Sequence, residues 1–235
     1  MPQQGPLNWL DGNGWLIVSG GGDVLRGDIA HIDTRLLSLI NLDRPMVVLL
    51  EGGARQDADD VLDYYTALGG PIGEAFALNT LTREHFFSAD FLTLLEEAGT
   101  LYICGDNPLP LLQYLYKTPA MERIQRGFTT LQALTIMVTG GNAATIGKWA
   151  IGPAPDYLQA IGLDFLKNTV VEPYFTRTED AVVLRNINQL GPGILGLGIP
   201  ERTALAFGPQ GQVETWGQQP VTVVVSTSKP DAGRA

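Results

Sequence analysis

The chain has 235 residues, a length that fits one large domain or two small ones, and we expect one. Apolar residues make up 45% and charged residues 17% of the chain, a balance that excludes an intrinsically disordered protein. The 15 Lys and Arg against 25 Asp and Glu give a net charge of −10, which would repel a nucleic-acid backbone. One cysteine and two histidines exclude a disulfide framework and disfavour a metal centre, so we expect no cofactor.

The N-terminal segment lacks a basic start followed by a long apolar core, and no run approaches the ~20 apolar residues of a membrane-spanning helix. We therefore expect a soluble, cytoplasmic protein with neither a membrane nor a nucleic acid as partner. Its expected organisation is a loose segment over residues 1–14, one domain over 15–225 and a flexible tail over 226–235.

Strands and helices alternate through the first 138 residues. Short apolar runs bounded by Gly or Pro predict strands at residues 15–18, 46–50, 72–78, 101–104 and 134–138. Apolar residues at helical spacing predict helices at residues 29–40 after an Asp28 cap, 57–68, 88–98, 109–118 and 121–132. This alternation predicts a mostly parallel sheet with helices on both faces.

The last third of the chain has a different pattern. Short strands bounded by Gly and Pro are predicted near residues 169–171, 194–199, 203–207, 213–216 and 221–225, with one helix near 181–190. We expect these strands to extend the sheet and to add an antiparallel hairpin edge that turns over residues 208–211.

Two glycine-rich turns follow predicted strands, and ligands bind beyond the carboxyl ends of strands in an open α/β sheet. The first turn, Gly-Gly-Gly at residues 20–22, lacks the G-x-G-x-x-G spacing, so a tight turn is favoured over a nucleotide cradle. The second, Gly-Gly-Asn-Ala-Ala at 140–144, follows a strand in the manner of a nucleophile elbow. It carries no Ser or Cys with which to attack a carbonyl.

Further short segments complete a series of five. Cys-Gly-Asp-Asn at residues 104–107 is similar to G-G-D-Q, Val-Glu-Pro-Tyr-Phe-Thr-Arg at 171–177 to V-D-Q-H-F-x-x-R, and Gly-Ile-Pro-Glu-Arg-Thr-Ala-Leu at 198–205 to G-I-D-E-x-T-A-L. With the glycine turn at 20–22, and with 140–144 in place of G-T-S-A-G, this series resembles the cyanophycinase and dipeptidase E family of serine peptidases. The resemblance implies the three-layer flavodoxin-like α/β fold of the class I glutamine amidotransferases, with antiparallel edge strands near the C-terminus.

The resemblance also implies a degenerate catalytic triad. The family's serine falls on Asn142 or, shifted by one residue, on Ala143, and its histidine falls on Tyr174. Only the acidic partner keeps its chemistry, as Glu201. A phenol with a pKa near ~10 is a poor proton shuttle at neutral pH compared with an imidazole near ~6.5.

The same comparison implies four further site residues. Gly105 and Asp106 would supply backbone N–H groups like those of an oxyanion hole, and Asn107 and Arg177 are candidate ligand contacts. We expect Asn142 or Ala143, Tyr174 and Glu201 to converge at the carboxyl end of the sheet, with Gly105 and Asp106 on the opposite wall. Tyr174 and Glu201 should come within hydrogen-bond reach, directly or through one water molecule.

Two functions follow from these residues. The first is a non-catalytic homologue that keeps the fold as a binding or structural protein, whose partners would be a small peptide or amino-acid-like ligand and a second copy of the chain. The alternative is an active peptidase or amidase that uses Cys104, which ends a strand and precedes a predicted helix. That alternative needs a lowered thiol pKa, whereas a buried and inert cysteine is the simpler interpretation.

Overall fold

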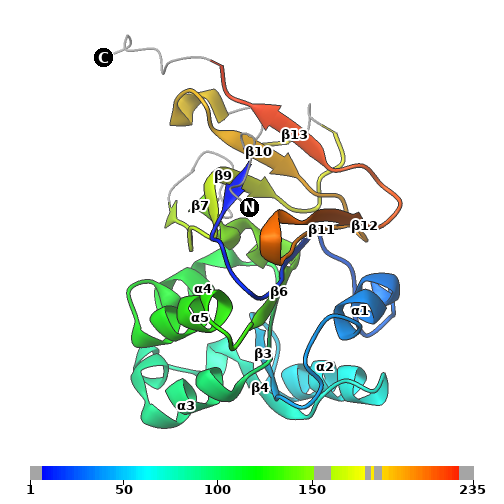
Figure 1. The fold of residues 1–235 in the computed structure, drawn as a ribbon, viewed down its shortest axis with the longest axis vertical. Helices are drawn as coiled ribbons and strands as arrows, with labels where there is room; N and C mark the ends of the chain where they lie inside the picture. The colour runs from blue at the N-terminus through cyan, green and yellow to red at the C-terminus, as the bar shows by residue number, and fades with distance from the viewer. Residues whose placement is uncertain (1–6, 151–159, 178–180, 183–186, 228–235) are drawn as a thin grey trace.

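The structure is a computed structural model that describes residues 7–150, 160–177, 181–182 and 187–227. Within these residues the chain forms a seven-stranded sheet and a six-stranded sheet. Figure 1 shows the seven-stranded sheet between two groups of helices in the lower part of the molecule, with the six-stranded sheet above it.

The seven-stranded sheet has the strand order β12-β11-β2-β6-β5-β3-β4. Its parallel strands are β2 (Leu16–Ser19), β3 (Met46–Leu50), β4 (Gly73–Ala77), β5 (Thr100–Cys104) and β6 (Thr135–Thr139). The antiparallel edge consists of β11 (Ala204–Phe207) and β12 (Val213–Trp216). The parallel sheet and its antiparallel edge confirm the prediction. The predicted hairpin turn is also confirmed, because the Gly208 N–H donates to the Gln212 carbonyl at 2.9 Å.

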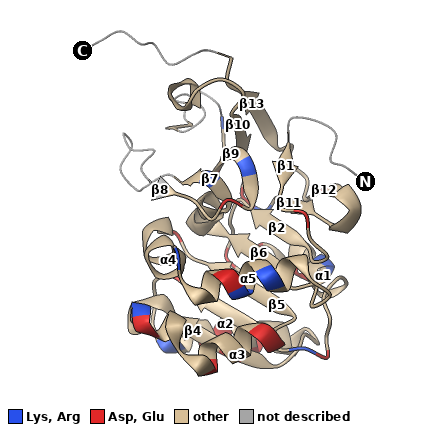
Figure 2. Cartoon of the chain, turned by 60° about the vertical axis from the view of Figure 1, so that its left-hand side comes forward, with Lys and Arg blue, Asp and Glu red and all other residues tan. Residues whose placement is uncertain are grey.

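Helices cover both faces of this sheet. Those on one face are α1 (Ala30–Leu37) and α2 (Arg55–Ala67), and those on the other are α3 (Ala89–Glu97), α4 (Pro108–Leu115) and α5 (Pro119–Thr129). Successive strand residues alternate between the two cores, so that Ile17 and Tyr102 pack toward α1 and α2 while Val18 and Ile103 pack toward the other helices. Figure 2 shows charged residues on the outer helices, whereas β5 and β6 carry none.

The start of α4 borders the region where the site is found. Asn107 caps this helix by accepting a hydrogen bond from the Leu109 N–H at 3.1 Å, and Pro108 follows in the first turn, which suits its fixed φ. The start of α1 corrects a prediction, because Asp28 does not cap it and the N-cap residue Ile29 offers no side-chain hydrogen bond. The described 3₁₀ helices are η1 (Leu78–Thr80), η2 (Arg83–Phe87), η3 (Gly140–Ile146), η4 (Ile187–Leu190) and η5 (Pro209–Gly211).

The six-stranded sheet corrects the expectation for the last third of the chain. Its strands are β1 (Asn8–Trp9), β7 (Gly147–Ala150), β8 (Ala160–Ile161), β9 (Leu166–Glu172), β10 (Leu195–Gly198) and β13 (Thr222–Val225). The strands predicted near residues 169–171, 194–199 and 221–225 therefore do not extend the first sheet. The hairpin of β11 and β12 occupies the β2 edge, so these strands pair with one another instead.

The N-terminal segment, expected to be loose, is packed from residue 8 onward. Trp9 is only 8% exposed, and its ring lies 5.1 Å from that of Phe207 on β11, so β1 connects the two sheets. One hydrophobic cluster contains Val138, Leu166 and Leu197 and thus side chains of both sheets. Residues 1–6, residues 183–186 of the predicted helix and residues 228–235 of the predicted tail lie outside the described residues. Ser226, the first residue of the predicted tail, is buried and donates its hydroxyl to the Gly191 carbonyl at 2.5 Å.

None of the helices within the described ranges combines the length and apolarity needed to cross a membrane.

Candidate functional site

The site forms where strands of both sheets end side by side. β9 and β10 are parallel, with Glu172 opposite Gly198, so the loops that follow them emerge at the same edge. Both loops bind the glycine turn after β2: the Tyr174 N–H donates to the Gly20 carbonyl at 2.9 Å, and the Arg202 N–H donates to the Gly21 carbonyl at 2.9 Å. Backbone pairing thus brings together side chains that are far apart in sequence.

The glycine turn allows Tyr174 to approach closely. Gly21 has a φ of +115°, and a Cβ at this position would lie 2.2 Å from the Tyr174 ring. Tyr174 itself has a φ of +54°, a conformation that non-glycine residues adopt at a cost of about 1 kcal/mol or more. The turn at residues 20–22 is therefore the support for an aromatic side chain.

A cavity of about 570 Å³ lies at this junction, on the α1 and α2 side of the sheet. Its floor consists mainly of buried strand and helix side chains, namely Leu50, Val61, Tyr102, Cys104 and Thr139. Its mouth consists of more exposed polar side chains, namely Asp23, Asp28, Asp57, Asp106, Tyr174 and Glu201. The carboxyl ends of β2, β3, β5 and β6 all border it, as expected for a ligand site in an open α/β sheet.

In the turn after β6 the residue that lines the cavity is Gly140, whereas the two predicted elbow residues, Asn142 and Ala143, do not line it. Gly140 directly follows the strand, has a φ of +72° and lines the cavity. A Cβ on Gly140 would lie 2.9 Å from the Tyr174 hydroxyl oxygen. Asn142 and Ala143 are fully buried in η3 and lie outside the set of described residues that line the cavity. Asn142 instead donates its side-chain N–H to the Cys104 carbonyl at 3.1 Å.

Tyr174, Glu201, Gly105 and Asp106 line the same cavity. The Tyr174 hydroxyl donates to Asp106 Oδ1, so its proton is not used for the direct hydrogen bond to Glu201 that was one form of the expectation. The phenol is longer than an imidazole and reaches across to the turn after β5. Burial, followed by the hydrogen bond and charge of Asp106, raises the pKa of Tyr174 well above its usual range. The hydroxyl therefore stays protonated at neutral pH.

The backbone N–H groups after Gly105 already have an acceptor. Glu51 Oε2 accepts from the Asp106 N–H at 3.1 Å and from the Asn107 N–H at 2.8 Å. In this conformation the two donors face Glu51 instead of a ligand. Arg177 is exposed and lies outside the described lining of the cavity.

Cys104 lies on the cavity floor as a free thiol. Its residue is 6% exposed, and Sγ lies 3.9 Å from the Leu49 carbonyl. Burial, reinforced by the negative charges of Asp106 and Glu51, raises the pKa of the thiol to about 12. Since the thiolate is the nucleophilic form, this environment opposes catalysis by Cys104.

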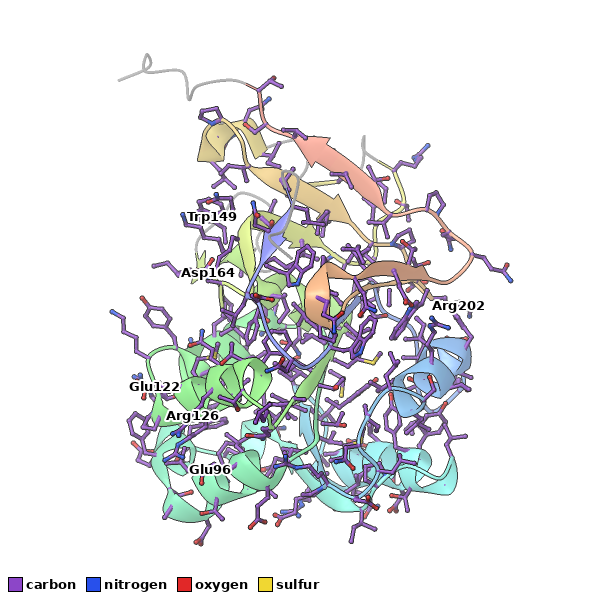
Figure 3. All side chains as sticks on the ribbon, in the orientation of Figure 1. Glu96, Glu122, Arg126, Trp149, Asp164 and Arg202 are labelled. Carbon is purple, nitrogen blue, oxygen red and sulfur yellow. The ribbon has the colours of Figure 1, made fainter. Side chains whose placement is uncertain are left out.

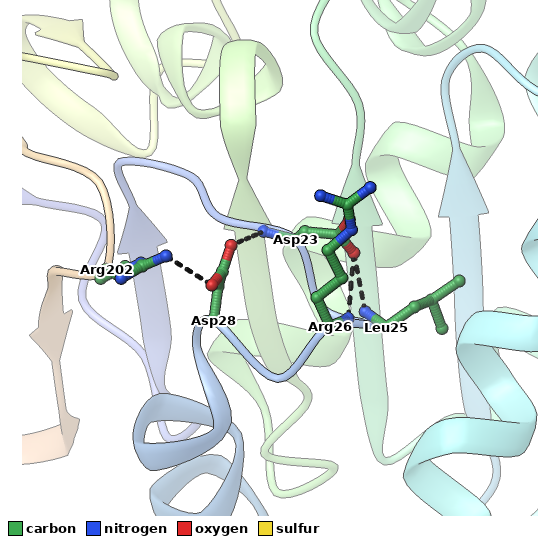
Figure 4. Close-up of polar contacts among 5 residues, drawn as sticks. All are labelled: Asp23, Leu25, Arg26, Asp28 and Arg202. Carbon is green, nitrogen blue, oxygen red and sulfur yellow. Dashed lines mark hydrogen bonds and ion pairs between the residues drawn. The ribbon is translucent and has the colours of Figure 1, made fainter.

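The loop after β2 is held by ionic and hydrogen bonds (Figure 4). Asp28 accepts from the Asp23 N–H at 3.3 Å and from the Arg202 guanidinium at 2.5 Å. Asp23 in turn accepts from the N–H groups of Leu25 and Arg26 at 3.0 and 3.2 Å. Arg202 lies beside α1 (Figure 3), so these contacts connect the loop after β10 to the start of that helix.

No three His, Cys, Asp or Glu side chains in the described part of the chain gather in a way that could hold a metal ion. The arrangement offers a negatively charged mouth, a partly apolar floor and a phenol in place of a base.

No family model matches this chain. Cyanophycinases from Trichormus variabilis and from Nostoc sp. are each 28% identical to it over 169 residues, which cover 66% of this chain and 56% of each relative. The match thus spans little more than half the length of these relatives.

Solved structures resemble the chain over almost its whole length. A peptidase from an acI-B1 actinobacterium has a TM-score of 0.64 at 17% identity, with 93% of this chain and 96% of that chain covered. A candidate peptidase E protein from Listeria monocytogenes has a TM-score of 0.59 at 16% identity, with 88% and 99% covered. The expected flavodoxin-like α/β fold is confirmed, and the comparisons support a relationship to peptidases of this fold.

Several cavity residues give no recognisable functional signal in the sequence. Tyr102 lies inside a predicted strand, Thr139 directly follows one, and Asp28 is the expected cap of a helix. β6 ends at Thr139, so Gly140 is the first residue after the strand. The sequence signal for Gly140 was its glycine itself, since a positive φ directly after a strand favours glycine.

Proposed function

We propose that this chain is a non-catalytic relative of the cyanophycinase-like peptidases that uses the cavity to bind a small peptide or amino-acid-like ligand. The observation that carries the proposal is Gly140. A nucleophile elbow holds its reacting side chain on a sharp, strained turn between a strand and a helix, facing the substrate. Gly140 has the matching position and positive φ, and it has no side chain.

The residues around Gly140 supply neither a substitute nucleophile nor a base. The Thr139 hydroxyl has no hydrogen-bond partner among the described residues, so no general base activates it. The raised pKa of Tyr174 keeps its hydroxyl protonated, and the hydrogen bond to Asp106 uses that proton. Proton transfer to and from a leaving group would therefore lack a suitable side chain.

The alternative function uses Cys104 as the nucleophile, and its position on the cavity floor favours it. The raised thiol pKa and the burial of the side chain weigh against it. A single set of assays distinguishes the two functions.

The test is turnover by the purified chain of β-aspartyl-arginine polymer, aspartyl dipeptides and a simple aryl ester, with a cyanophycinase assayed in parallel as the positive control. We expect no turnover above the buffer rate and no covalent labelling by a fluorophosphonate probe. Turnover that disappears in Cys104→Ser would establish the alternative function. Turnover that disappears in Tyr174→Phe would also overturn the non-catalytic assignment, with Tyr174 in place of Cys104 as the residue required for activity.

A further inference from the structure

The outer edge of the six-stranded sheet is open. β13 lies at one end of the strand order β13-β10-β9-β7-β8, and its only neighbour among the described strands is β10. Figure 1 shows β13 on the side of this sheet that faces away from the seven-stranded sheet. An open edge presents backbone N–H and C=O groups with which another strand can pair.

The pairing with β10 determines which backbone groups of β13 point outward. The two strands are antiparallel, and the Ser226 N–H donates to the Ile194 carbonyl at 2.9 Å, so Ser226 faces β10. The hydrogen bonds between two antiparallel strands use every second residue of each strand. The N–H and C=O groups of Val223 and Val225 therefore point away from β10, toward the open edge.

The side chains of these two valines are also uncovered. Val223 is opposite Leu197 of β10, and opposite residues of paired strands lie on the same face of a sheet. Leu197 is fully buried in the hydrophobic core, whereas Val223 and Val225 are 57% and 48% exposed. The apolar face of the sheet thus continues past the core to the edge, where one more strand would cover it.

Three other edge strands are protected in ways that β13 is not. β4 and β12, the outer strands of the seven-stranded sheet, carry Glu74 and Glu214, and β8, at the far end of the six-stranded sheet, has only two residues. β13 has four residues, Thr-Val-Val-Val, with neither a charge nor a proline, and Figure 2 shows it without a charged side chain. Charges, prolines and short strands keep edges from pairing, so their absence from β13 indicates an edge that accepts a strand.

We propose that β13 pairs antiparallel with β13 of a second copy of this chain, which joins two six-stranded sheets into one across a two-fold axis. The register that uses both outward residues places Val223 opposite the partner's Val225, and Val224 opposite the partner's Val224. Each of the two pairs of Val223 with Val225 exchanges two hydrogen bonds between N–H and C=O groups. This inference goes beyond the proposed function and does not depend on it.

Charge favours a second copy at this edge. The chain has a net charge of −10, so two copies repel each other unless they meet at an uncharged surface, and β13 is such a surface. In the two-fold register no charged residue lies opposite another along the paired strands. Dimers with a two-fold axis are also the commonest assemblies of soluble proteins.

The first measurement is the mass of the full chain in solution, by sedimentation velocity at several protein concentrations. The contact consists of four backbone hydrogen bonds and a few valines, which makes a small interface, so we expect a dissociation constant of about 20 μM. The chain should then be mostly monomeric at about 2 μM and mostly dimeric at about 200 μM. A chain that stays monomeric at the higher concentration would overturn the inference.

Val225→Pro tests whether β13 forms the contact. Proline removes the outward N–H, which β10 does not use, so the variant should keep the fold and dimerise at least about tenfold more weakly. The matched control is Val213→Pro on β12, the edge of the other sheet. The Gly208 N–H donates to the Gln212 carbonyl, so by the same alternation the N–H of Val213 also points away from its neighbouring strand.

The control should dimerise like the wild type, and both variants should unfold within a few degrees of it. A dimer of wild-type affinity in Val225→Pro would place the interface elsewhere and overturn the inference.

A disulfide tests the register without weakening the contact. In the proposed register Val224 lies opposite its own copy at a position without hydrogen bonds, where the Cα atoms are about 4.5 Å apart, within disulfide range. Cys104, the chain's single cysteine, is buried, so a link between chains would come from the introduced residue. Under mild oxidation Val224→Cys should form a covalent dimer on a non-reducing gel, and Val213→Cys should form none. No link in Val224→Cys, or equal links in both variants, would overturn the proposed pairing.

Discussion

Two groups of buried polar side chains lie next to each other on one face of the seven-stranded sheet, and they differ in how far their hydrogen-bonding groups are satisfied. Between α1 and α2, Asp33 accepts hydrogen bonds from Tyr65 at 2.6 Å and from Tyr64 at 3.0 Å. Tyr102 packs edge-on against Tyr65, with ring centroids 5.0 Å apart. The Tyr102 hydroxyl interacts with that of Tyr65, whereas the Thr139 hydroxyl has no partner among the described residues.

The network around Asp33 connects two helices and uses its hydrogen-bonding capacity within the fold. The Thr139 hydroxyl leaves its hydrogen-bonding capacity unused, which costs stability. Polar side chains of similar burial can therefore have opposite effects on the free energy of unfolding.

The largest effect that we expect concerns Cys104, the thiol on the cavity floor. A pKa of about 12 instead of 9.0 leaves about 1000-fold less thiolate at pH 8. Alkylation of the native protein by iodoacetamide should therefore be slower than that of the unfolded chain by at least this factor, as measured by mass spectrometry over time. A labelling rate that levels off below pH 8 would mean that the floor is reactive and would favour the cysteine hydrolase.

Single Tyr→Phe variants should show how much each buried hydroxyl contributes to the free energy of unfolding. Tyr65→Phe leaves the buried Asp33 with one hydrogen bond fewer and should lower the free energy of unfolding by about 1–3 kcal/mol. Tyr102→Phe removes a hydroxyl whose interaction is with the hydroxyl of Tyr65, and it should lower the free energy by less, about 0.5–1.5 kcal/mol. Urea unfolding measures both. A loss in Tyr102→Phe as large as that in Tyr65→Phe would contradict this difference between the two hydroxyls.

The contribution of Asp33 to the free energy of unfolding should also depend on pH. Burial, opposed by the hydrogen bonds from Tyr65 and Tyr64, raises the pKa of Asp33 to about 6 from 3.8. The folded state then binds this proton more tightly than the unfolded state does. The contribution to stability is full below about pH 4 and is lost as the pH rises through 6.

The test compares the free energy of unfolding of the wild type with that of Asp33→Asn. Between pH 7 and pH 5, the stability of the wild type should rise by about 1 kcal/mol relative to Asp33→Asn. The other carboxylates titrate in both proteins, so their contributions cancel. A constant difference across this interval would mean that Asp33 titrates normally.

The smallest effect should come from Thr139→Val. The two side chains have nearly the same shape, and the hydroxyl that is removed has no partner. We expect an unchanged stability or a gain of up to about 1 kcal/mol, seen as a rise of a few degrees in the unfolding temperature. A loss larger than about 1 kcal/mol would reveal a hydrogen bond of Thr139 within the fold.

Much of the fold was predictable because local patterns determine it. The apolar runs that became β3 and β5 are too continuous for exposed strands, and the Pro and Asn residues near α4 mark its start. The second sheet was not predictable, because the short strands β9, β10 and β13 carry no signal that names their partners. Their pairing depends on which sheet edge the hairpin of β11 and β12 already occupies.

The candidate site was also predictable only in part. The motif around Tyr174 and the motif around Glu201 indicated one site, and the structure brings both side chains to one cavity. The sequence left the elbow on Asn142 or Ala143, because glycine-rich stretches align equally well in several registers. The structure instead places Gly140 in the lining of the cavity, with a positive φ directly after the strand.

The sequence by itself determined the alternation of strands and helices, the glycine-rich turn without Ser or Cys at residues 140–144 and the excess of acidic residues. These are properties of composition and of local spacing, and no distant contact changes them. The tertiary structure alone decided that Tyr174 donates to Asp106, that Glu51 accepts from the N–H groups after β5 and that the Thr139 hydroxyl has no partner among the described residues. Hydrogen bonds operate over about 3 Å, and residues that distant in sequence come within this range only after both sheets have formed.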